Sequence, residues 1–226
     1  MTSRLLVIRH AESRANVARL VGANEVCTGL TDVGREQAGL LAGRFAATGP
    51  IPDVAYASSV RRAQETCAVL TERLGIAEAT VERDLRELDP GAAEGMTAAD
   101  YEAVYGPVAD WREERADVPL APGGETWRAL IARAGRMVRG LLAAHPDETV
   151  VAVSHGGFIA AAVQAVLNVD LASRSAIINV AHTSITELHE TDGVLHLLRV
   201  GDVGHLASPE GGLRSSTSPT AEATPR

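Results

Sequence analysis

Two short apolar runs, each leading into a histidine, constrain the fold of this 226-residue chain most strongly. The first run covers residues 5–8 and leads into Arg9 and His10, and the second covers residues 149–154 and leads into His155. Continuous apolar runs of this length are typical of strands that are buried on both faces of a parallel sheet. Such strands present functional side chains at their carboxyl ends, where ligand crevices form. Both histidines are therefore expected to handle a ligand, and the cation beside His10 suggests an anion.

Further strands alternate with helical patterns along the chain. Strands are expected at 4–9, 53–57, 80–82, 149–154, 177–180 and 183–189, and Asp192-Gly193 predicts a hairpin that joins 184–190 to 194–200. Helices are expected from the N-cap Thr31 to about Gly49, over 60–74, from Glu125 through Leu142, and from Gly156 to about Leu167. This alternation predicts an α/β fold: a three-layer α/β/α sandwich with a mostly parallel central sheet and a late antiparallel hairpin.

Length and composition predict one ordinary globular domain over 1–206, with a lid or specificity insertion at about 98–122. The tail at 207–226 is rich in Ser, Thr, Pro, Gly and Ala, so it is expected to be disordered. No apolar stretch approaches a bilayer span, no signal peptide is recognisable, and the two cysteines suit a reduced compartment, so a cytoplasmic protein without membrane contact is expected.

The formal net charge of −8 argues against nonspecific nucleic-acid binding. All 21 basic residues are arginine, so any phosphate site must use arginine, histidine and backbone amides. The absence of lysine also excludes a P-loop lysine and a Schiff-base lysine. Phosphoryl transfer needs charge neutralisation, an in-line nucleophile and an acid for the leaving oxygen, and this chain offers candidates for all three.

Several motifs occur along residues 5–206 in an order that resembles the histidine phosphatase superfamily, also called the phosphoglycerate mutase-like family. The similarity implies a phosphoglycerate mutase-like fold. Ala11 replaces the glycine of the family's first motif, Arg-His-Gly-Glu, and this change can alter the approach of the backbone to phosphate. The matching segments are Arg9-His10-Ala11-Glu12 with Asn16, the segment 30–38, Ser58-Ser59-Val60-Arg61-Arg62-Ala63, the segment 85–95, Gly123-Gly124-Glu125-Thr126 with Arg133, Ser154-His155-Gly156-Gly157, and Gly204-His205-Leu206.

The resemblance implies a role for each matching residue. His10 would attack phosphorus and form a phosphohistidine, and Glu87 would protonate the departing oxygen. Arg9, Arg62 and His155 would hold the phosphoryl oxygens, joined by Asn16 and the amide of Gly156. No metal and no cofactor are expected, because arginines take the place of Mg²⁺.

Other readings compete with several of these assignments. The carboxylates Glu82, Asp84, Asp89 and Glu94 compete with Glu87 for the acid role, and Arg62 could be a surface arginine like Arg61. His182, His189 and His196 are interpreted most simply as surface or packing residues, and His205 as a structural link. Cys67 and Arg73 have the bare spacing of cysteine-dependent phosphatases, but the residues between them form a good helix interior whose amides are already paired, so this reading is rejected.

Within the family, phosphatase chemistry on a small phosphorylated metabolite is favoured over mutase chemistry, because a mutase must also hold a second anionic group and this chain has no lysine. Arg112 and Arg115 in the insertion could bind substrate, or they could pair with neighbouring glutamates on a solvated helix. A phospholigand-binding protein without turnover ranks lowest, because it would be expected to lose His10 or the acid. The natural substrate and the oligomeric state stay open; an edge strand could pair two subunits into a homodimer.

Overall fold

The computed structural model describes residues 2–107, 116–169 and 178–207. A six-stranded sheet forms its centre, with the strand order β3-β2-β4-β1-β5-β6. Strands β1 to β4 pair in parallel, whereas β5 pairs antiparallel with both β1 and β6. The strands are β1 (Thr2–Arg9), β2 (Val54–Ser58), β3 (Thr80–Glu82), β4 (Thr149–Ser154), β5 (Ile185–Thr191) and β6 (Val194–Asp202).

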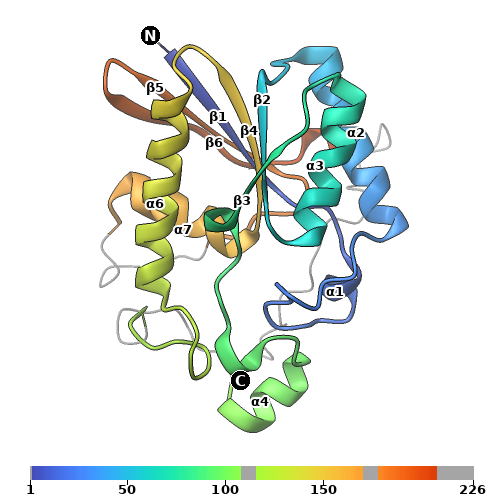
Figure 1. Ribbon diagram of the computed structural model, residues 1–226, viewed down its shortest axis with the longest axis vertical. Helices are drawn as coiled ribbons and strands as arrows, with labels where there is room; N and C mark the ends of the chain where they lie inside the picture. The colour runs from blue at the N-terminus through green and yellow to red at the C-terminus, as the bar shows by residue number, and fades with distance from the viewer. Residues whose placement is uncertain (1, 108–115, 170–177, 208–226) are drawn as a thin grey trace.

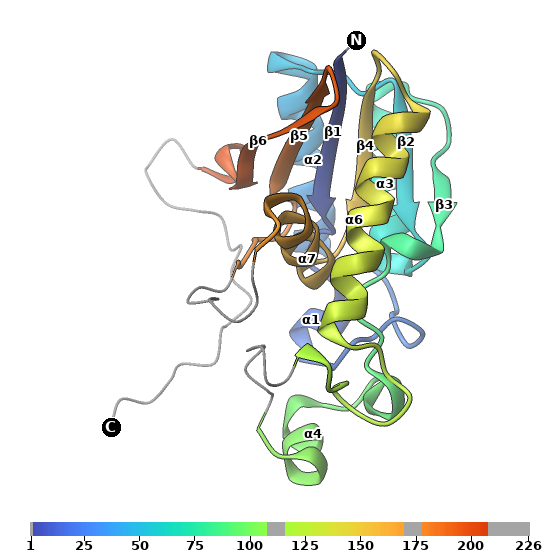
Figure 2. The ribbon, with the colours of Figure 1, turned by 90° about the vertical axis from the view of Figure 1, so that its left-hand side faces the viewer.

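Helices cover both faces of the sheet, as Figures 1 and 2 show. Helices α2 (Asp32–Thr48) and α3 (Arg61–Leu74) pack on one face, and α6 (Trp127–Ala144) and α7 (Gly156–Leu167) pack on the other. The short helices α1 (Arg14–Val17) and α4 (Ala98–Tyr105) lie beyond the carboxyl end of β1, at the lower end of the molecule in both views. This arrangement is the predicted three-layer α/β/α sandwich.

Strand β1 is buried on both of its faces, as the continuous apolar run predicts. Leu5 and Val7 belong to the hydrophobic cluster under α6 and α7, whereas Leu6 and Ile8 belong to the cluster under α2 and α3. Successive side chains of a strand point to opposite faces, so a strand between two helical layers must be apolar throughout. The polar residues that follow β1 therefore mark the edge of the core.

Local signals fixed several element boundaries correctly. The Thr31 hydroxyl accepts a hydrogen bond from the Gly34 amide at the start of α2, and Gly75 ends α3 in the left-handed conformation. Asp192 and Gly193 form the predicted hairpin turn with φ of 53° and 77°, the positive values that a type I′ turn requires.

The strand expected at 177–180 is not formed by residues 178–180, which lie in a loop, and residue 177 lies outside the described residues. Strand β5 also starts only at Ile185. The backbone of the preceding loop is engaged elsewhere: the carbonyl of Val180 accepts a hydrogen bond from the Arg9 guanidinium, and the amide of Thr183 donates to the carbonyl of Arg9. Thr183 has φ +56°, which interrupts an extended strand.

Parts of the chain named in the sequence analysis lie outside the described residues, among them 108–115 of the expected insertion and 208–226 of the tail. Within the ranges that the structure describes, no helix is long and apolar enough to cross a bilayer.

Candidate active site

The two strand-end histidines meet at the carboxyl edge of the sheet. Arg9 on β1 stands in register with Ser154 on β4, and the His10 amide donates to the Ser154 carbonyl at 2.9 Å. The ring centroids of His10 and His155 are 5.1 Å apart. Both side chains are almost fully buried, with 2% and 0% of their surface exposed. Adjacent parallel strands thus bring together two residues that are 145 positions apart in the sequence.

The hydrogen bonds of His10 fix which ring nitrogen carries the proton. Its Nδ1 lies 2.8 Å from the carbonyl oxygen of Ala11, which can only accept, so Nδ1 is the donor. Its Nε2 accepts a hydrogen bond from Nε of Arg62 at 3.1 Å. Burial lowers the pKa of His10 well below its ordinary value, and the positive charge of Arg62 lowers it further. His10 is therefore a neutral imidazole whose Nε2 lone pair can act as a nucleophile without prior loss of a proton.

Arg62 connects the two histidines. It lies in the first turn of α3, directly beyond the carboxyl end of β2, and only 3% of it is exposed. Besides His10, its guanidinium donates to Nδ1 of His155 at 3.1 Å and to the backbone carbonyls of Gly22 and Ala23. The competing interpretation made Arg62 a surface arginine like Arg61, but only Arg61 lies on the surface of this helix, where it forms an ion pair with Glu65.

His155 is also neutral. Its Nδ1 accepts from Arg62, so its Nε2 carries the proton and donates to the hydroxyl of Ser58 at 2.8 Å. Burial lowers the pKa of His155 well below its ordinary value, and the neighbouring arginines, Arg62 first among them, act in the same direction. Ser58 ends β2 and is fully buried; it belongs to a sequence motif, but the motif gave no sign of this contact.

Arg9 adds a second cation to this edge of the sheet. Burial lowers the pKa of Arg9 to about 10, while the negative charge of Glu87 opposes that shift, so the guanidinium stays charged near neutral pH. A Cβ atom built on Gly156 would lie 3.5 Å from Nε of Arg9, so the start of α7 packs directly against this side chain. The Gly156 amide belongs to the first turn of α7, where backbone N–H groups have no helical acceptor and favour anions.

Glu87 faces the start of the same helix. Its Oε2 accepts a hydrogen bond from the Gly157 amide at 2.9 Å, and its Oε1 accepts from the Leu88 amide at 2.9 Å. Among the competing carboxylates, Asp89 and Glu94 are bound elsewhere, to the amides of Gly91 and Glu25. Glu87 therefore has the position expected of an acid that serves the site.

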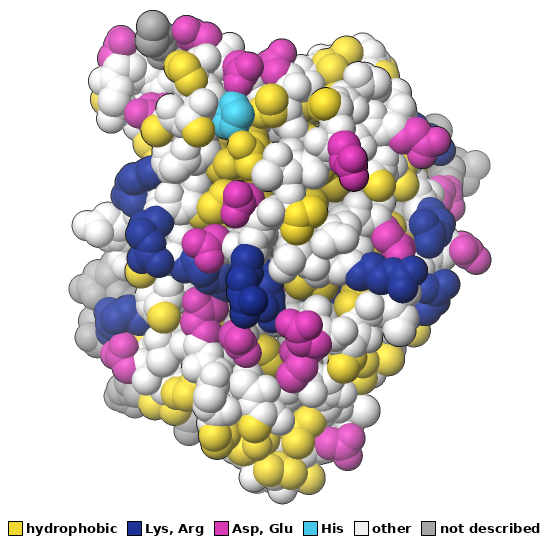
Figure 3. Space-filling model, viewed as in Figure 1, with side chains coloured by type: hydrophobic (Ala, Val, Ile, Leu, Met, Phe, Trp, Pro, Cys, Tyr) yellow, Lys and Arg dark blue, Asp and Glu magenta, His cyan; other side chains and the backbone are white. Residues whose placement is uncertain are grey.

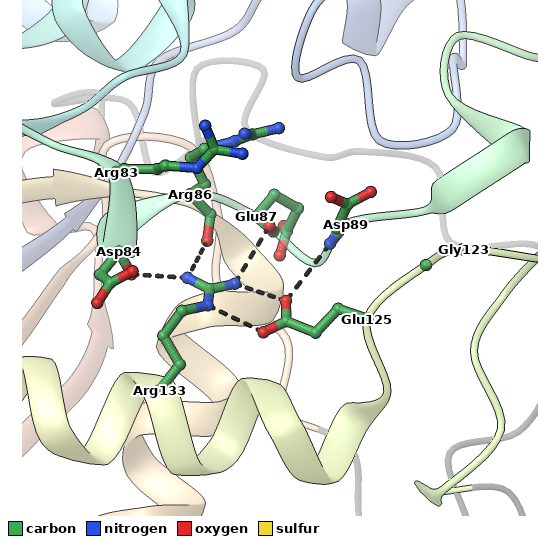
Figure 4. A pocket seen from close by; sticks show the side chains of 9 residues that line it. Arg83, Asp84, Arg86, Glu87, Asp89, Gly123, Glu125 and Arg133 are labelled. Carbon is green, nitrogen blue, oxygen red and sulfur yellow. Dashed lines mark hydrogen bonds and ion pairs between the residues drawn. The ribbon is translucent and has the colours of Figure 1, made fainter.

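An arginine on α6 holds the loop that carries Glu87, as Figure 4 shows. Arg133 pairs through two hydrogen bonds with Glu125, at 2.9 and 2.7 Å. The same guanidinium donates to the backbone carbonyls of Asp84, Arg86 and Glu87. These groups line a pocket of about 290 Å³. On this face of the molecule, basic and acidic side chains gather together near the middle (Figure 3). The motif that contains Glu125 was found in the sequence, but this connection was not.

The remaining predicted residues are less closely tied to this network. Asn16 uses its Oδ1 to accept hydrogen bonds from the amide and hydroxyl of Ser13, which form the cap of α1, so its side chain can offer a ligand only its Nδ2. Arg112 and Arg115 lie outside the described residues. The structure brings together Arg9, His10, Arg62, Glu87, His155 and Gly156.

His182, which the sequence suggested to be a surface or packing residue, lies next to the site. His182 lies in the loop before β5, is 2% exposed, and has its ring centroid 5.7 Å from that of His10. Neither of its ring nitrogens has a hydrogen-bond partner among the described residues. Burial lowers its pKa to about 3, and the charges of Arg9 and Arg62 add to that effect. No sequence motif pointed to it, because the rule about strand ends concerns residues that follow a strand, and His182 precedes one.

Cys67 takes no part in this site. It lies inside α3, and burial raises the pKa of its thiol to about 12, so it is not a thiolate near neutral pH. Among the described residues, no group of three or more His, Cys, Asp or Glu side chains is arranged to hold a metal ion.

Comparisons with known proteins find relatives that match most of this chain. The chain is 34% identical over 196 residues to glucosyl-3-phosphoglycerate phosphatase of Mycobacterium tuberculosis, an alignment that covers 82% of this chain and 84% of the relative. It is 33% identical over 172 residues to the 2,3-bisphosphoglycerate-dependent phosphoglycerate mutase of Brucella anthropi, covering 73% and 82%. A solved structure of the mycobacterial phosphatase with inorganic phosphate superimposes with a TM-score of 0.73 at 29% identity, covering 90% of this chain and 99% of that one.

The model of the histidine phosphatase superfamily (branch 1) matches residues 5–203, which include both histidine-bearing strand ends, Arg62 and the loop of Glu87. This chain therefore belongs to the histidine phosphatase superfamily, branch 1.

Proposed function

We propose that this protein is a phosphomonoesterase that hydrolyses a small phosphorylated metabolite through a phosphohistidine on His10. The observation that carries the proposal is the fixed tautomer of His10, whose Nε2 lone pair faces Arg62 and whose ring lies beside a second neutral histidine. A neutral imidazole in this state needs no general base before it attacks phosphorus. The family membership and the phosphate complex of the mycobacterial phosphatase support the same chemistry.

In the first step, Nε2 of His10 attacks phosphorus and the bond from phosphorus to the leaving oxygen breaks. Arg62 donates to the phosphoryl oxygens in place of its hydrogen bond to Nε2, and Arg9 and the Gly156 amide supply further donors. His155, whose N–H is held by Ser58, orients the Arg62 guanidinium through its Nδ1. Protonated Glu87 delivers its proton to the leaving oxygen, so the alcohol departs neutral. Charge stabilisation rests on the two guanidinium groups and on amides at the start of α7, with no step assigned to a metal.

In the second step, a water molecule attacks the phosphorus of the phosphohistidine. Glu87, now a carboxylate, accepts a proton from that water, and the phosphorus–nitrogen bond breaks. The lone pair returns to Nε2 of His10, and inorganic phosphate leaves. Glu87 thus ends the cycle protonated again, as the first step requires, and atoms and charges balance over the cycle.

Phosphatase chemistry is favoured over mutase chemistry by the charges around the acid loop. A mutase must also bind a second anionic group while its substrate reorients. In the described residues, Arg86 forms an ion pair with Glu25 at 3.1 Å, and Arg133 pairs with Glu125 at 2.7 Å. These two of the three arginines that line the pocket are therefore already paired with carboxylates; the third is Arg83. The mutase alternative is kept because a mutase is among the relatives at 33% identity.

Trapping of the intermediate tests the proposal. The protein is mixed with a radiolabelled phosphomonoester and quenched rapidly; we expect an acid-labile label in the wild type and in His196→Asn, a surface control on β6, but not in His10→Asn. Absence of label from a wild-type protein that still binds phosphate would make it a binding protein. Release of inorganic phosphate is then compared with interconversion of 3- and 2-phosphoglycerate. Fast interconversion with little phosphate release would establish a mutase.

The substrate is sought with a panel ranked by kcat/KM. The panel contains sugar phosphates, nucleotide monophosphates, glucosyl-3-phosphoglycerate and 3-phosphoglycerate. If Arg112 and Arg115 bind the substrate as proposed from the sequence, the charge-removing variants Arg112→Gln and Arg115→Gln raise KM for the best substrate. Unchanged KM values would leave them as surface residues.

A further inference from the structure

His182 is a buried imidazole beside His10 whose ring nitrogens have no partner among the described residues. Its imidazole is 2% exposed, and its ring centroid lies 5.7 Å from that of His10. Buried polar atoms are almost always hydrogen-bonded, because an unpaired buried donor or acceptor is destabilising. Both ring nitrogens of His182 nevertheless have no partner among the described residues. If His182 only filled space, its unpaired ring nitrogens would lower the stability of the fold, because an apolar side chain of similar size would fill the same space without burying unpaired polar atoms.

The backbone around His182 is held in an unusual conformation. The next residue, Thr183, has φ +56°, a left-handed value that a β-branched residue adopts only under constraint. Strained residues of this kind cluster at functional sites, where the surrounding structure over-determines them. The strain is thus a sign that the direction of the His182 side chain is fixed for a purpose.

Three hydrogen bonds supply the constraint. The Thr183 amide donates to the carbonyl of Arg9 at 2.9 Å, and the Thr183 hydroxyl donates to the carbonyl of His182 at 2.7 Å. Since that hydroxyl has only one hydrogen, the contact of 2.8 Å between its oxygen and Nε2 of His205 must be donated by His205. The motif residue His205 therefore acts as the structural link that the sequence analysis expected, and what it orients is the turn of His182.

The charge state of His182 defines the chemistry that it can offer. Burial together with Arg9 and Arg62 lowers its pKa to about 3, so the ring is neutral near neutral pH. A neutral imidazole presents one N–H donor and one acceptor nitrogen. The two guanidinium groups whose charges act on it, Arg9 and Arg62, are donors only. A ligand oxygen at the site would supply the acceptor that the His182 N–H lacks among the described residues. With the His10 ring centroid 5.7 Å away, an oxygen of a phosphoryl group on His10 is the ligand atom suited to that role.

We propose that His182 binds the phosphoryl group directly, donating a ring N–H to one of its oxygens while the group is transferred to and from His10. The inference rests on the proposed function for the identity of the group, but it concerns a residue that no motif assigns. It makes the phosphoryl site a row of three imidazoles supplied by β4, β1 and the segment before β5.

Direct binding measurements test this role without requiring turnover. Inorganic phosphate and vanadate are titrated by calorimetry against the wild type, His182→Phe, His182→Asn and the surface control His196→Phe. His182→Phe keeps a ring but no donor, and we expect its affinity for phosphate to fall about 10-fold, the value of one hydrogen bond to a charged acceptor. His182→Asn keeps a donor and should stay within about threefold of the wild type, as should His196→Phe. Equal affinity of folded His182→Phe and wild type would overturn the inference.

A second measurement uses the unaltered protein, in case the variants fold poorly. The ring nitrogens of all histidines are labelled with ¹⁵N, and phosphate is added; the His182 resonances must move toward those of a hydrogen-bonded donor. If the other site histidines respond and His182 does not, the inference is wrong although the site binds phosphate. If His182 responds but no phosphohistidine can be trapped, the inference stands and the proposed function fails. A wild type that binds neither anion overturns both.

Discussion

Substitution of Gly157 by alanine is the sharpest structural test of the acid. Gly157 lies in the first turn of α7 with ordinary helical φ, so alanine is favourable there by about 0.5–1 kcal/mol on propensity alone. The added Cβ would stand 2.3 Å from Oε1 of Glu87 and 3.0 Å from its Cδ. Ordinary contacts of a Cβ begin near 3.4 Å, so the carboxylate must retreat by about 1 Å. Its hydrogen bond from the Gly157 amide, now 2.9 Å, is then lost.

The expected effect on catalysis is large and the expected effect on folding is small. A misplacement of about 1 Å can reduce rates about 10²-fold, and a general acid contributes about 10²- to 10⁴-fold. We therefore expect kcat for an alkyl phosphate to fall about 100-fold, or about 2.7 kcal/mol. The lost hydrogen bond to a carboxylate offsets the propensity gain, so the free energy of unfolding should change by no more than about 1 kcal/mol.

The assay separates the two duties of Glu87. p-Nitrophenyl phosphate has a good leaving group that needs little protonation, but hydrolysis of the phosphohistidine still needs a base. Gly157→Ala should therefore release a rapid burst of p-nitrophenol followed by a slow steady state. The matched control is Gly140→Ala in α6, where an added Cβ meets nothing within 4 Å, so kcat should not change. If Gly157→Ala keeps wild-type kcat on both substrates, the acid role of Glu87 or its dependence on this contact is wrong.

Three further predictions concern the surroundings of the site. Arg133→Lys keeps the charge but cannot span Glu125 and the loop carbonyls together, so kcat should fall about 10- to 100-fold with little change in KM. Arg128→Lys on the same helix is the control. Equal kcat values for the two variants would refute the positioning role of Arg133. Cys67→Ser should keep kcat within twofold, because burial raises the pKa of the thiol to about 12, and a loss of more than 10-fold would implicate the sulfur. Acid should destabilise the fold, because the folded pKa values of three buried histidines lie below the unfolded value near 6.5. Below that pH the unfolded chain therefore binds more protons than the folded chain. Each histidine then lowers the free energy of unfolding by up to about 1.4 kcal/mol per pH unit, until the pH reaches its folded pKa. Urea unfolding at about pH 7 and pH 5 measures this, and equal stability would contradict it for His10, His155 and His182.

The sequence predicted the layers and the two strand-end histidines because both depend on local patterns. Apolar runs and helix caps are each encoded by a few consecutive residues, and adjacent parallel strands present their carboxyl ends at the same edge of the sheet. Arg62 and Glu87 required the family resemblance as well. From the residues alone, Arg62 could have been a surface arginine like Arg61, and Glu87 was one of several nearby carboxylates.

His182 and the Arg133 contacts could not be predicted, because each depends on a partner distant in sequence. His182 reaches the site only because β5 runs antiparallel to β1, with Ile185 opposite Ile8, so the beginning of β5 lies at the edge where β1 ends. Arg133 acts on a loop more than forty positions earlier, through backbone carbonyls that any residue type would present. The periodicity of a single sequence shows neither whether two strands pair in parallel or antiparallel nor which backbone carbonyl an arginine will bind.

The spacing of the strands in the sheet sets the distances between the three imidazoles of the site. Neighbouring strands lie about 4.8 Å apart, and the three imidazoles, carried by or next to β4, β1 and β5, are spaced at 5.1 and 5.7 Å from ring to ring. Their separation is thus inherited from main-chain pairing. A consequence follows for the hairpin turn at Gly193, at the far end of β5, where φ is +77°. A substitution there that shifted the register of β5 by one residue would move the His182 ring about 3.3 Å along the strand. The site would then lose its activity although none of its residues had been changed.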